Sequence, residues 1–387
     1  MRVALNVEQL LYRAPGGIGR YTSKLLTLLP TLSPNDSLVP FTARHRPAEI
    51  EQAYRDLDLG PATTRPVCLA LPRPLLYEGW NLAGMPKLAW LSRSLAGVDL
   101  IHAPSLAVPP RPASARLVVT IHDVAPALYP ETFPRHGRWF HARGLQAAAR
   151  RADLVITVSQ AAAGEIAAHS TIGSDRVRVI ANGVDATLAT AEEAAATRTR
   201  YRLGDAPYVL WVGSLEPRKD VGTLVAAFAN MSDAQIGDHL LVLAGPSGWL
   251  DDGLIARADR DRLGPRLRML GRAGDTQLRA LYAGARLFAF PSRHEGFGLP
   301  VLEAMVQGTP VVCADIAALR EVTGEAARLV APGDVDAWSQ ALLELLTDDP
   351  ARHQLAVAGR ARAAVFSWER TVSETRAVYA EALGQPG

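Results

Sequence analysis

The chain has 387 residues, which suggests roughly two to three domains, and 41 Lys and Arg against 39 Asp and Glu give a formal net charge of +2. This near balance argues against a dedicated nucleic-acid binder, which needs a basic excess to neutralise phosphates. Hydrophobic residues make up 48% of the chain, enough to bury more than one core, so disorder as the main state is excluded.

Cysteine and lysine usage narrow the class of protein further. Cys68 and Cys313 lie far apart, so neither a disulfide framework nor a Cys-based zinc cluster is expected, and a reducing cytoplasm fits. We find no signal-peptide pattern and no apolar run near the ~20 residues that cross a bilayer. Lys occurs only at Lys24, Lys87 and Lys219, so each is a candidate for a role that needs a compact ammonium.

The first half alternates short apolar runs with helix-length segments, a pattern typical of a parallel sheet covered by helices on both faces. The expected strands are Val3–Val7, Leu100–His102, Leu117–Ile121, Leu154–Val158 and Val177–Ile180. Gly16-Gly17-Ile18-Gly19 is expected to form a loop before an amphipathic helix over Arg20–Leu29. Such a loop could hold a phosphate at the helix N-terminus, but an ordinary flexible βα loop explains this fragment equally well.

Two histidines end expected strands of this half. The run VVTIHD delivers His122 and Asp123 to the carboxyl edge of the sheet, where open α/β sheets bind ligands. A lone histidine more often has a structural role, in which it is hydrogen-bonded inside the fold. The position of His122 at the carboxyl edge of the sheet is the one argument for a functional role. His102, at the end of another strand, is a second candidate in a poorer context.

The segment 187–202 is rich in Ala and charge, carries no strand signal and is predicted to be a linker. Beyond it the strand pattern begins again, at Tyr208–Val212, Leu240–Ala244, Leu267–Leu270, Leu287–Phe290 and Val311–Ala314. The tail after Arg328 is predicted to be helical without strands, with helices over Asp334–Leu346, Ala351–Val365 and Trp368–Leu383. The expected fold is therefore α/β, with two doubly wound domains that face each other across a cleft.

A basic pair follows the first strand of the second half, in the run GSLEPRKD. Arg218 and Lys219 adjoin a predicted helix start, where the helix dipole already attracts anions. Together they can bind a diphosphate, Arg218 through paired hydrogen bonds and Lys219 as a point charge. Solvated surface charge is the default explanation of a basic pair, but the scarcity of Lys weakens it here.

Residues 290–305, FPSRHEGFGLPVLEAM, are predicted to form a strand, a glycine-rich turn and a helix. Glu295 lies in the turn and Glu303 about two turns into the helix. The backbone amides of residues 297–299 can point at an oxygen-rich ligand, and two nearby carboxylates suit sugar hydroxyls. A glycosidase would also use paired carboxylates, but it has no need of amides and cations suited to a diphosphate.

This stretch resembles the signature of retaining glycosyltransferases of family 4, in which two glutamates are separated by seven residues. The resemblance covers nearly the whole chain in family order: GGIGRY, VVTIHD, DLVITVS, VIANGVD, VGSLEPRKD, LAGPSGW, LRALYAGARLFAFPS and FSWERT. It implies a GT-B fold, with a Rossmann-like acceptor domain over residues 1–186, a linker over 187–202 and a Rossmann-like donor domain over 203–366. A C-terminal helix over 367–387 would return to the first domain.

The resemblance also implies roles for single residues. Glu303 would bind the ribose of the nucleotide, and Glu295 the hydroxyls of the donor sugar. Arg218 and Lys219 would bind the departing diphosphate, and His122 would lie near the sugar C6 hydroxyl and the anomeric centre. Further donor contacts are implied at Gly16, Gly17, Ser214, Gly271, Arg272 and the amides of Phe297, Gly298 and Leu299. Many family members have Arg where this chain has Ser214, so Arg218 is assigned by resemblance to the subgroup with EPRK.

The implied reaction is a same-face transfer without a catalytic metal or cofactor, in which the departing diphosphate accepts the acceptor's proton. Two alternatives stay open. A nucleotide-sugar epimerase on the same fold would change the donor alone, without an acceptor. A non-catalytic nucleotide-sugar-binding module would bind the donor and release no nucleotide.

The motifs EPRK, Gly248-Trp249 and HEGFGLPVLEAM resemble bacterial mannosyltransferases that use GDP-mannose, which is the expected donor; UDP- and dTDP-sugars stay open. The expected acceptor is a glycan, glycolipid or lipid-linked molecule of cell-envelope polysaccharide synthesis. Basic residues around Trp139 and Phe140 suit a helix that lies on anionic lipid, although packing of these aromatics on the sheet is the favoured interpretation. We expect a cytoplasmic enzyme, peripheral on the inner membrane face if this helix binds lipid.

Overall fold

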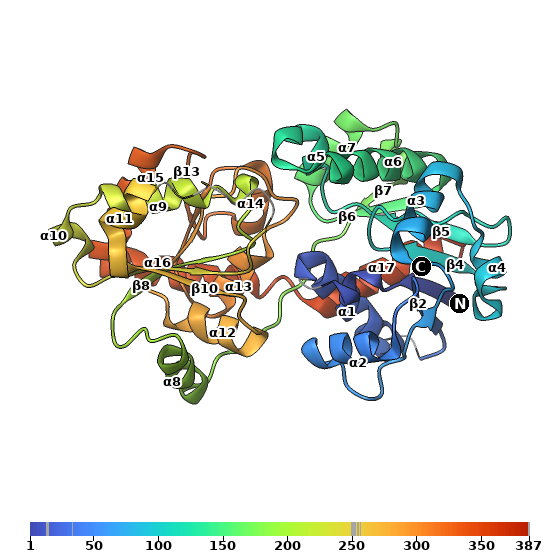
Figure 1. The fold of residues 1–387 in the computed structure, drawn as a ribbon, viewed down its shortest axis with the longest axis horizontal. Helices are drawn as coiled ribbons and strands as arrows, with labels where there is room; N and C mark the ends of the chain where they lie inside the picture. The colour runs from blue at the N-terminus through green and yellow to red at the C-terminus, as the bar shows by residue number, and fades with distance from the viewer. Residues whose placement is uncertain (13–14, 33, 249–252, 254, 256, 386–387) are drawn as a thin grey trace. The chain divides into compact units, whose positions relative to one another are not determined.

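The computed structural model describes residues 1–12, 15–32, 34–248, 253, 255 and 257–385, which divide into two compact units (Figure 1). The first unit contains Met1–Pro130, Arg135–Gly183 and Trp368–Gly387. The second contains Glu131–Pro134 and Val184–Ser367. The first unit is therefore assembled from three separate pieces of the chain. Trp249 of the Gly-Trp pair lies outside the described residues.

Within the described residues, the first unit is built on a seven-stranded parallel sheet in the order β3-β2-β1-β4-β5-β6-β7. Its strands are β1 (Arg2–Asn6), β2 (Ser37–Thr42), β3 (Val67–Cys68), β4 (Leu100–Ala103), β5 (Arg116–Thr120), β6 (Leu154–Thr157) and β7 (Val177–Val179). Strands β4 and β6 are buried at every position, because helices cover both faces of a parallel sheet.

The described part of the second unit is built on a six-stranded parallel sheet in the order β10-β9-β8-β11-β12-β13. Its strands are β8 (Tyr208–Val212), β9 (Leu240–Ala244), β10 (Leu267–Gly271), β11 (Leu287–Phe290), β12 (Val311–Ala314) and β13 (Arg328–Val330). Each sheet thus runs third-second-first-fourth, and the order reverses between β1 and β4 and between β8 and β11. Ligands of doubly wound sheets bind at the carboxyl ends of the strands beside this reversal.

Helices surround the first sheet, and the C-terminal helix is one of them. The helical segments are η1 (Glu8–Leu11), α1 (Gly16–Leu32), α2 (Pro47–Asp56), α3 (Arg73–Ala83), α4 (Leu88–Leu91), η2 (Arg93–Leu95), α5 (Ala125–Leu128), α6 (Arg135–Arg151), α7 (Gln160–His169), η4 (Ser174–Arg176) and α17 (Trp368–Ala382). The short η3 (Pro130–Thr132) enters the Glu131–Pro134 piece that belongs to the second unit. Helix α17, red in Figure 1, packs against α1 and strands β5 and β6. None of the helices in the described part of the chain is long and apolar enough to span a bilayer.

His102 anchors this C-terminal helix and is a structural residue. Its Nδ1 lies 2.6 Å from the hydroxyl of Tyr379 on α17, and its Nε2 lies 2.8 Å from Oγ1 of Thr120 on β5. Burial lowers the pKa of His102 to about 3, so the ring is neutral at physiological pH. Both ring nitrogens are thus used inside the fold, which explains a strand-end histidine without catalysis.

The predicted linker contains a helix that belongs to the second unit. The helical segments of this unit are α8 (Ala191–Arg200), η5 (Pro217–Lys219), α9 (Val221–Asn230), α10 (Asp233–Ile236), α11 (Arg257–Leu263), η6 (Gly264–Arg266), α12 (Asp275–Gly284), α13 (Leu299–Val306), α14 (Ala317–Thr323), α15 (Val335–Thr347) and α16 (Asp349–Ala363). Helix α8 packs against α12 and starts at a capping box, in which the Thr190 hydroxyl accepts from the Glu193 amide at 3.1 Å. Ala and charge in the segment 187–202 therefore mark a capped helix.

Three strands depart from the predicted pattern. Strand β2 contains Pro40 and opens with the exposed Ser37, so it lacks the apolar run of its neighbours. Strand β3 has only two residues. Strand β13, over Arg328–Val330, is a short edge strand at the start of the tail, so the prediction of a tail without strands is wrong at this point. Short strands carry too few residues for a periodic signal.

Candidate active site

The loops after β8 and β11 meet at the point where the strand order reverses. Arg218 and Lys219 lie in η5, which follows β8, and the carbonyl of Arg218 accepts a hydrogen bond from the Arg293 amide at 2.9 Å. The Arg293 side chain also binds the Asp220 carboxylate, with Nε 2.9 Å from Oδ2. Asp220 has φ +48°, a left-handed conformation that turns the chain from η5 into α9. These contacts fix the two loops to each other.

Glu295 forms an ion cluster with the two predicted diphosphate ligands. Lys219 Nζ lies 2.6 Å from Oε1 of Glu295, and Arg218 Nη1 lies 3.4 Å from its Oε2. Lys219 and Glu295 are both 9% exposed. Arg218 Nη1 also donates to the carbonyl of His294 at 3.1 Å. Three of the four predicted catalytic residues are therefore in contact, which the sequence spacing does not reveal.

Burial and charge oppose each other in this cluster. Burial alone would raise the pKa of Glu295, but the neighbouring Lys219 and Arg218 outweigh it and hold that pKa below its usual range. Burial and the nearby Arg218 lower the pKa of Lys219, while Glu295 raises it. The carboxylate is therefore ionised, and its negative charge faces two cations. A carboxylate in this state is a weak nucleophile and a weak base.

The glycine-rich turn leads into α13 as predicted. Gly298 has φ +121°, and a Cβ at this position would lie 2.6 Å from a methyl group of Leu319, so only glycine fits. The side chains of Phe297 and Leu299 are buried. The turn thus places the backbone amides of residues 297–299 at the start of α13, where N–H groups have no partner within the helix itself.

Glu303 is oriented by a residue that sequence reasoning missed. Its Oε2 accepts a hydrogen bond from the hydroxyl of Tyr282 at 2.9 Å. Tyr282 lies on α12 and is buried, with its ring edge-on to Phe288 at 5.3 Å. A buried tyrosine needs a partner for its hydroxyl, so the Tyr in LYAGARLFAFPS was a usable signal. The partner itself could not be read from the sequence.

The remaining predicted donor contacts of the second unit lie at the carboxyl ends of two strands, β8 and β10. Ser214 follows β8 and is half-buried. Gly271 ends β10 with φ +68°, and both Gly271 and Arg272 are exposed. Strand β9 separates β10 from β8, so these two residues are two strands away from Ser214. The structure does not bring them into the ion cluster.

The glycines of GGIG form a helix start rather than the predicted loop. Helix α1 begins at Gly16, four residues before the expected start, and Gly16 and Gly17 are exposed. Gly16 has φ +60°, and a Cβ on Gly19 would lie 2.2 Å from Cβ of Pro15. Tight turning into the helix therefore accounts for these glycines, and it leaves helix N–H groups at the end of β1.

His122 lies in the first unit, after β5. Its Nε2 is 3.1 Å from the carbonyl of Pro104, and its ring is edge-on to Tyr21 at 5.2 Å. Burial lowers the pKa of His122 to about 4, so the imidazole is neutral. Because a carbonyl only accepts, Nε2 carries the proton and Nδ1 is a hydrogen-bond acceptor.

A second buried carboxylate, Glu8 in η1, was also missed. Its Oε2 accepts from the Ala43 amide at 3.0 Å, from the Tyr77 hydroxyl at 2.8 Å and from the Thr42 hydroxyl. Its Oε1 lies 2.9 Å from Nε2 of His45. The only sign of this buried carboxylate in the sequence was an acidic residue directly after the first strand, in NVEQLL. Its partners come from β2, the loop after it and α3.

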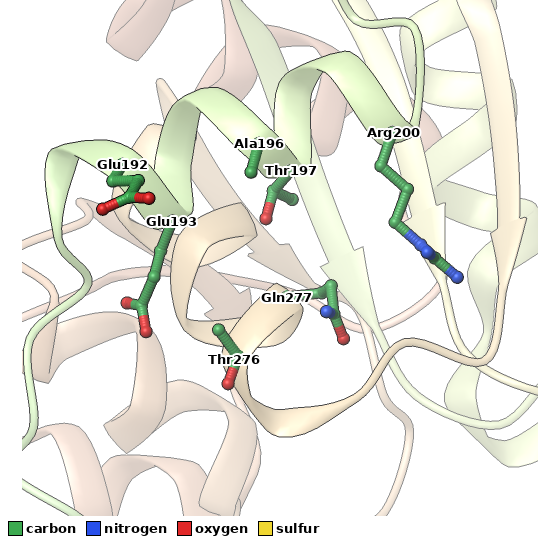
Figure 2. Close-up of a pocket in the computed structure, with 7 residues that line it drawn as sticks. All are labelled: Glu192, Glu193, Ala196, Thr197, Arg200, Thr276 and Gln277. Atoms are coloured by element: carbon green, nitrogen blue, oxygen red, sulfur yellow. The ribbon is translucent and has the colours of Figure 1, made fainter.

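A pocket lies between α8 and α12 of the second unit (Figure 2). Its lining residues are Glu192, Glu193, Ala196, Thr197, Arg200, Thr276 and Gln277. The two glutamates lie at one end and Arg200 at the other (Figure 2). None of the predicted site residues lines this pocket.

Two family models match the chain, Glycosyltransferase Family 4 over residues 15–188 and Glycosyl transferases group 1 over residues 195–362. The chain is 33% identical over 383 residues to O-antigen chain mannosyltransferase B of Escherichia coli, covering 98% of this chain and 99% of that protein. It is 29% identical over 348 residues to the serotype-specific mannosyltransferase WbdA of Escherichia coli, covering 84% of this chain and 42% of WbdA. The fold is similar to that of HepE from Anabaena in complex with UDP and glucose, with a TM-score of 0.73, 19% identity and coverage of 98% and 100%.

Proposed function

We propose that this chain, which belongs to glycosyltransferase family 4 and is a GT-B glycosyltransferase of polysaccharide biosynthesis, transfers mannose from GDP-mannose with retention of configuration. Two mannosyltransferases, one of them similar over its full length, support mannose as the sugar. The proposed acceptor is a glycan or a lipid-linked glycan of the cell envelope. The proposed location is the cytoplasm, at the inner face of the membrane.

The buried cluster of Arg218, Lys219 and Glu295 is the observation that carries this proposal. It lies at the carboxyl ends of β8 and β11, beside the amides at the start of α13. Two cations and the amides at the start of α13 are the proposed anion site, in a region of low dielectric where charge interactions are strong. Before the donor binds, these cations pair with the carboxylates of Glu295 and of Glu216, whose Oε2 lies 3.4 Å from Arg218 Nε. A diphosphate fits this site, and Glu295 can accept hydrogen bonds from the hydroxyls of the attached sugar.

In the proposed reaction, the bond from the anomeric carbon to the diphosphate oxygen breaks while the acceptor hydroxyl attacks on the same face. The acceptor's proton moves to a diphosphate oxygen. Lys219 and Arg218 stabilise the negative charge that grows on the diphosphate, the electrostatic contribution that is usually the largest in catalysis. No metal or other cofactor is included, because these two cations supply the positive charge. Glu295 is not assigned as a nucleophile, since two cations already neutralise it.

Further residues are assigned to the donor in this proposal, taken unit by unit. Glu303, held by Tyr282, binds the ribose hydroxyls. Ser214, Gly271, Arg272 and the amides of Phe297, Gly298 and Leu299 are assigned to the donor as well. In the first unit, the N–H groups of Gly16 and Gly17 at the start of α1 bind phosphate. Nδ1 of His122 accepts a hydrogen bond from the C6 hydroxyl of the sugar.

The proposal is tested with GDP, UDP, dTDP and ADP in a thermal-shift panel, followed by transfer from the matching sugar nucleotide to a mannose-containing lipid-linked glycan. A ligand that binds the native state raises Tm, and the largest shift is expected for GDP. The expected product carries an α-linked mannose, identified by its anomeric proton in NMR. A larger shift for UDP, or an inverted product, would contradict the donor or the stereochemistry. Change of the donor without an acceptor would indicate an epimerase.

A further inference from the structure

Exposed apolar side chains gather in one short segment of the first unit. Among the residues that the structure describes, eight large apolar side chains are exposed, and half of them fall between residues 75 and 90: Leu75 (65%), Leu82 (50%), Met85 (39%) and Trp90 (65%). Single exposed apolar residues are normal, but four of them between residues 75 and 90 make this segment a candidate interaction surface. We call residues 73–93, on α3 and α4, the α3–α4 surface.

The core does not require these side chains. Helix α3 buries Leu76, Tyr77 and Trp80 against the first unit. Leu75 and Leu82 lie seven positions apart, which is about two helical turns, so they share the opposite side of the helix. Helix α4 repeats the pattern, because it buries Leu88 and exposes Trp90. The outward apolar side chains are therefore surplus to folding.

The same surface is basic. Arg73, Lys87 and Arg93 are exposed, and Glu78 is the only acid between residues 73 and 93. Glu78 itself lies 3.5 Å from Nε2 of His136 on α6. Lys87, one of three lysines in the chain, has its ammonium 5.5 Å from the centre of the Trp90 ring. Exposed Trp and Leu beside Lys and Arg are typical of surfaces that lie in the headgroup region of anionic membranes.

The neighbouring helix α6 contributes charge but not an apolar face. Helices α3 and α6 pack together on one side of the first sheet (Figure 1). Phe140 of α6 packs on the core, and Trp139 is half-buried and stacked on His136. Arg135 and Arg143 are exposed. The predicted lipid contact through the aromatics of α6 thus has little exposed apolar area, whereas α3 and α4 supply it.

We propose that the α3–α4 surface docks on an anionic lipid bilayer. Trp90, Leu75 and Leu82 enter the headgroup boundary, while Lys87 and the flanking arginines bind lipid phosphates. A symmetric contact with a second copy is disfavoured, because it would bring the cations of the surface against their own copies. The inference rests on the proposed function in one respect, namely that a lipid-linked acceptor gives docking its purpose.

Co-sedimentation with vesicles tests this proposal without donor or acceptor. The full chain is mixed with phosphatidylcholine vesicles, with or without added phosphatidylglycerol, at low and high salt. The docking variant is Leu82→Gln with Trp90→Gln, and the matched control is Leu188→Gln with Val357→Gln, two exposed apolar residues of the second unit. Thermal melting checks that all proteins are folded. Lys87→Glu tests the electrostatic contribution.

We expect the parent and the control to sediment with anionic vesicles at low salt and less at high salt, because surface attraction is screened over about 8 Å at physiological ionic strength. The docking variant should lose binding by about tenfold or more, since two of its three apolar anchors are removed. A parent that stays in solution throughout, or a docking variant that sediments like the parent, would overturn the proposal. A concentration-dependent dimer that only the docking variant loses would overturn it in favour of a second copy. Failure of mannosyl transfer would leave the vesicle result unchanged, so the two proposals fail separately.

Discussion

The two units bury a carboxylate in two different ways. Glu295 of the second unit faces two cations, whereas Glu8 of the first unit is held by hydroxyls, a backbone amide and one histidine. The cluster around Glu295 suits an anionic ligand, because cations that already hold one anion can bind another when it arrives. The donors around Glu8 come from several segments and only His45 among them can carry a charge, so they hold those segments in place and suit a structural role.

The comparison predicts that removing a cation from the second unit has the largest effect. Lys219→Ala should lower kcat by about 10²–10³-fold, because the ammonium stabilises charge that grows on the leaving group. Donor affinity should fall less. Lys219→Arg should not restore turnover, since a planar guanidinium does not replace a point charge. Steady-state kinetics and calorimetric donor binding measure the two effects.

Lys24→Ala, in α1, is the control for the loss of one of the three lysines. Melting curves are needed, because Lys219→Ala leaves Glu295 with Arg218 as its only cation in the cluster. A near-normal kcat in a folded Lys219→Ala protein would mean that the cluster is structural, like that around Glu8.

Glu303 sharpens the comparison, because it belongs to the second unit but is held by a neutral hydroxyl. Glu303→Ala should weaken donor binding by roughly 1.5–3 kcal/mol, the usual contribution of a hydrogen bond to a charged group. Calorimetry with GDP measures this loss, and Glu325→Ala, an exposed glutamate of the same unit, is the control. Unchanged GDP affinity would remove Glu303 from the site.

Tyr282→Phe should have a smaller effect in the same direction. The variant keeps the ring and removes only the hydroxyl that orients Glu303, so we expect the KM for the donor to rise about fivefold, equivalent to about 1 kcal/mol. The kcat should stay close to that of the parent. Tyr208→Phe is a matched control, because it also removes one buried hydroxyl, which donates to the carbonyl of Leu281 at 2.7 Å. Equal KM values in the two variants would show that Tyr282 does not position Glu303.

The smallest expected effect concerns the first unit and pH. The hydrogen bond to Glu8 raises the pKa of His45, and Glu49, with Oε2 3.5 Å from Nδ1, adds to it. A raised folded-state pKa stabilises the protein below the unfolded value of about 6.5, and this stabilisation is lost as pH rises through the folded pKa. Near pH 6 the parent should therefore have a higher Tm than His45→Gln, and the difference in Tm should shrink toward pH 8. A difference that is constant with pH would contradict the assignment.

Much of the fold was predictable, and the physical reason is burial. Strands β8, β9, β11 and β12 were predicted with their observed bounds, because strands buried on both faces are continuous apolar runs. Strand β2 was missed because Pro40 and polar residues interrupt such a run. Within the site, the residue types of η5 and of the glycine-rich turn were enough to predict that both segments contribute to it. The contact of Lys219 with Glu295 was not, because it joins residues 76 positions apart through the order of the strands.

The three-piece construction of the first unit has a consequence for the order of folding. The second unit is almost one continuous stretch, Val184–Ser367, so it can fold as soon as that stretch has left the ribosome. Synthesis of the first unit starts earlier, but its folding cannot be completed before Trp368–Ala382 is present. Tyr379 of this helix is buried and contacts His102, 277 residues away in sequence. Closing such a long loop is slow. The nascent first unit therefore exposes the apolar surface that α17 covers until α17 itself has been synthesised, and during this period the unit is most open to chaperones and to aggregation.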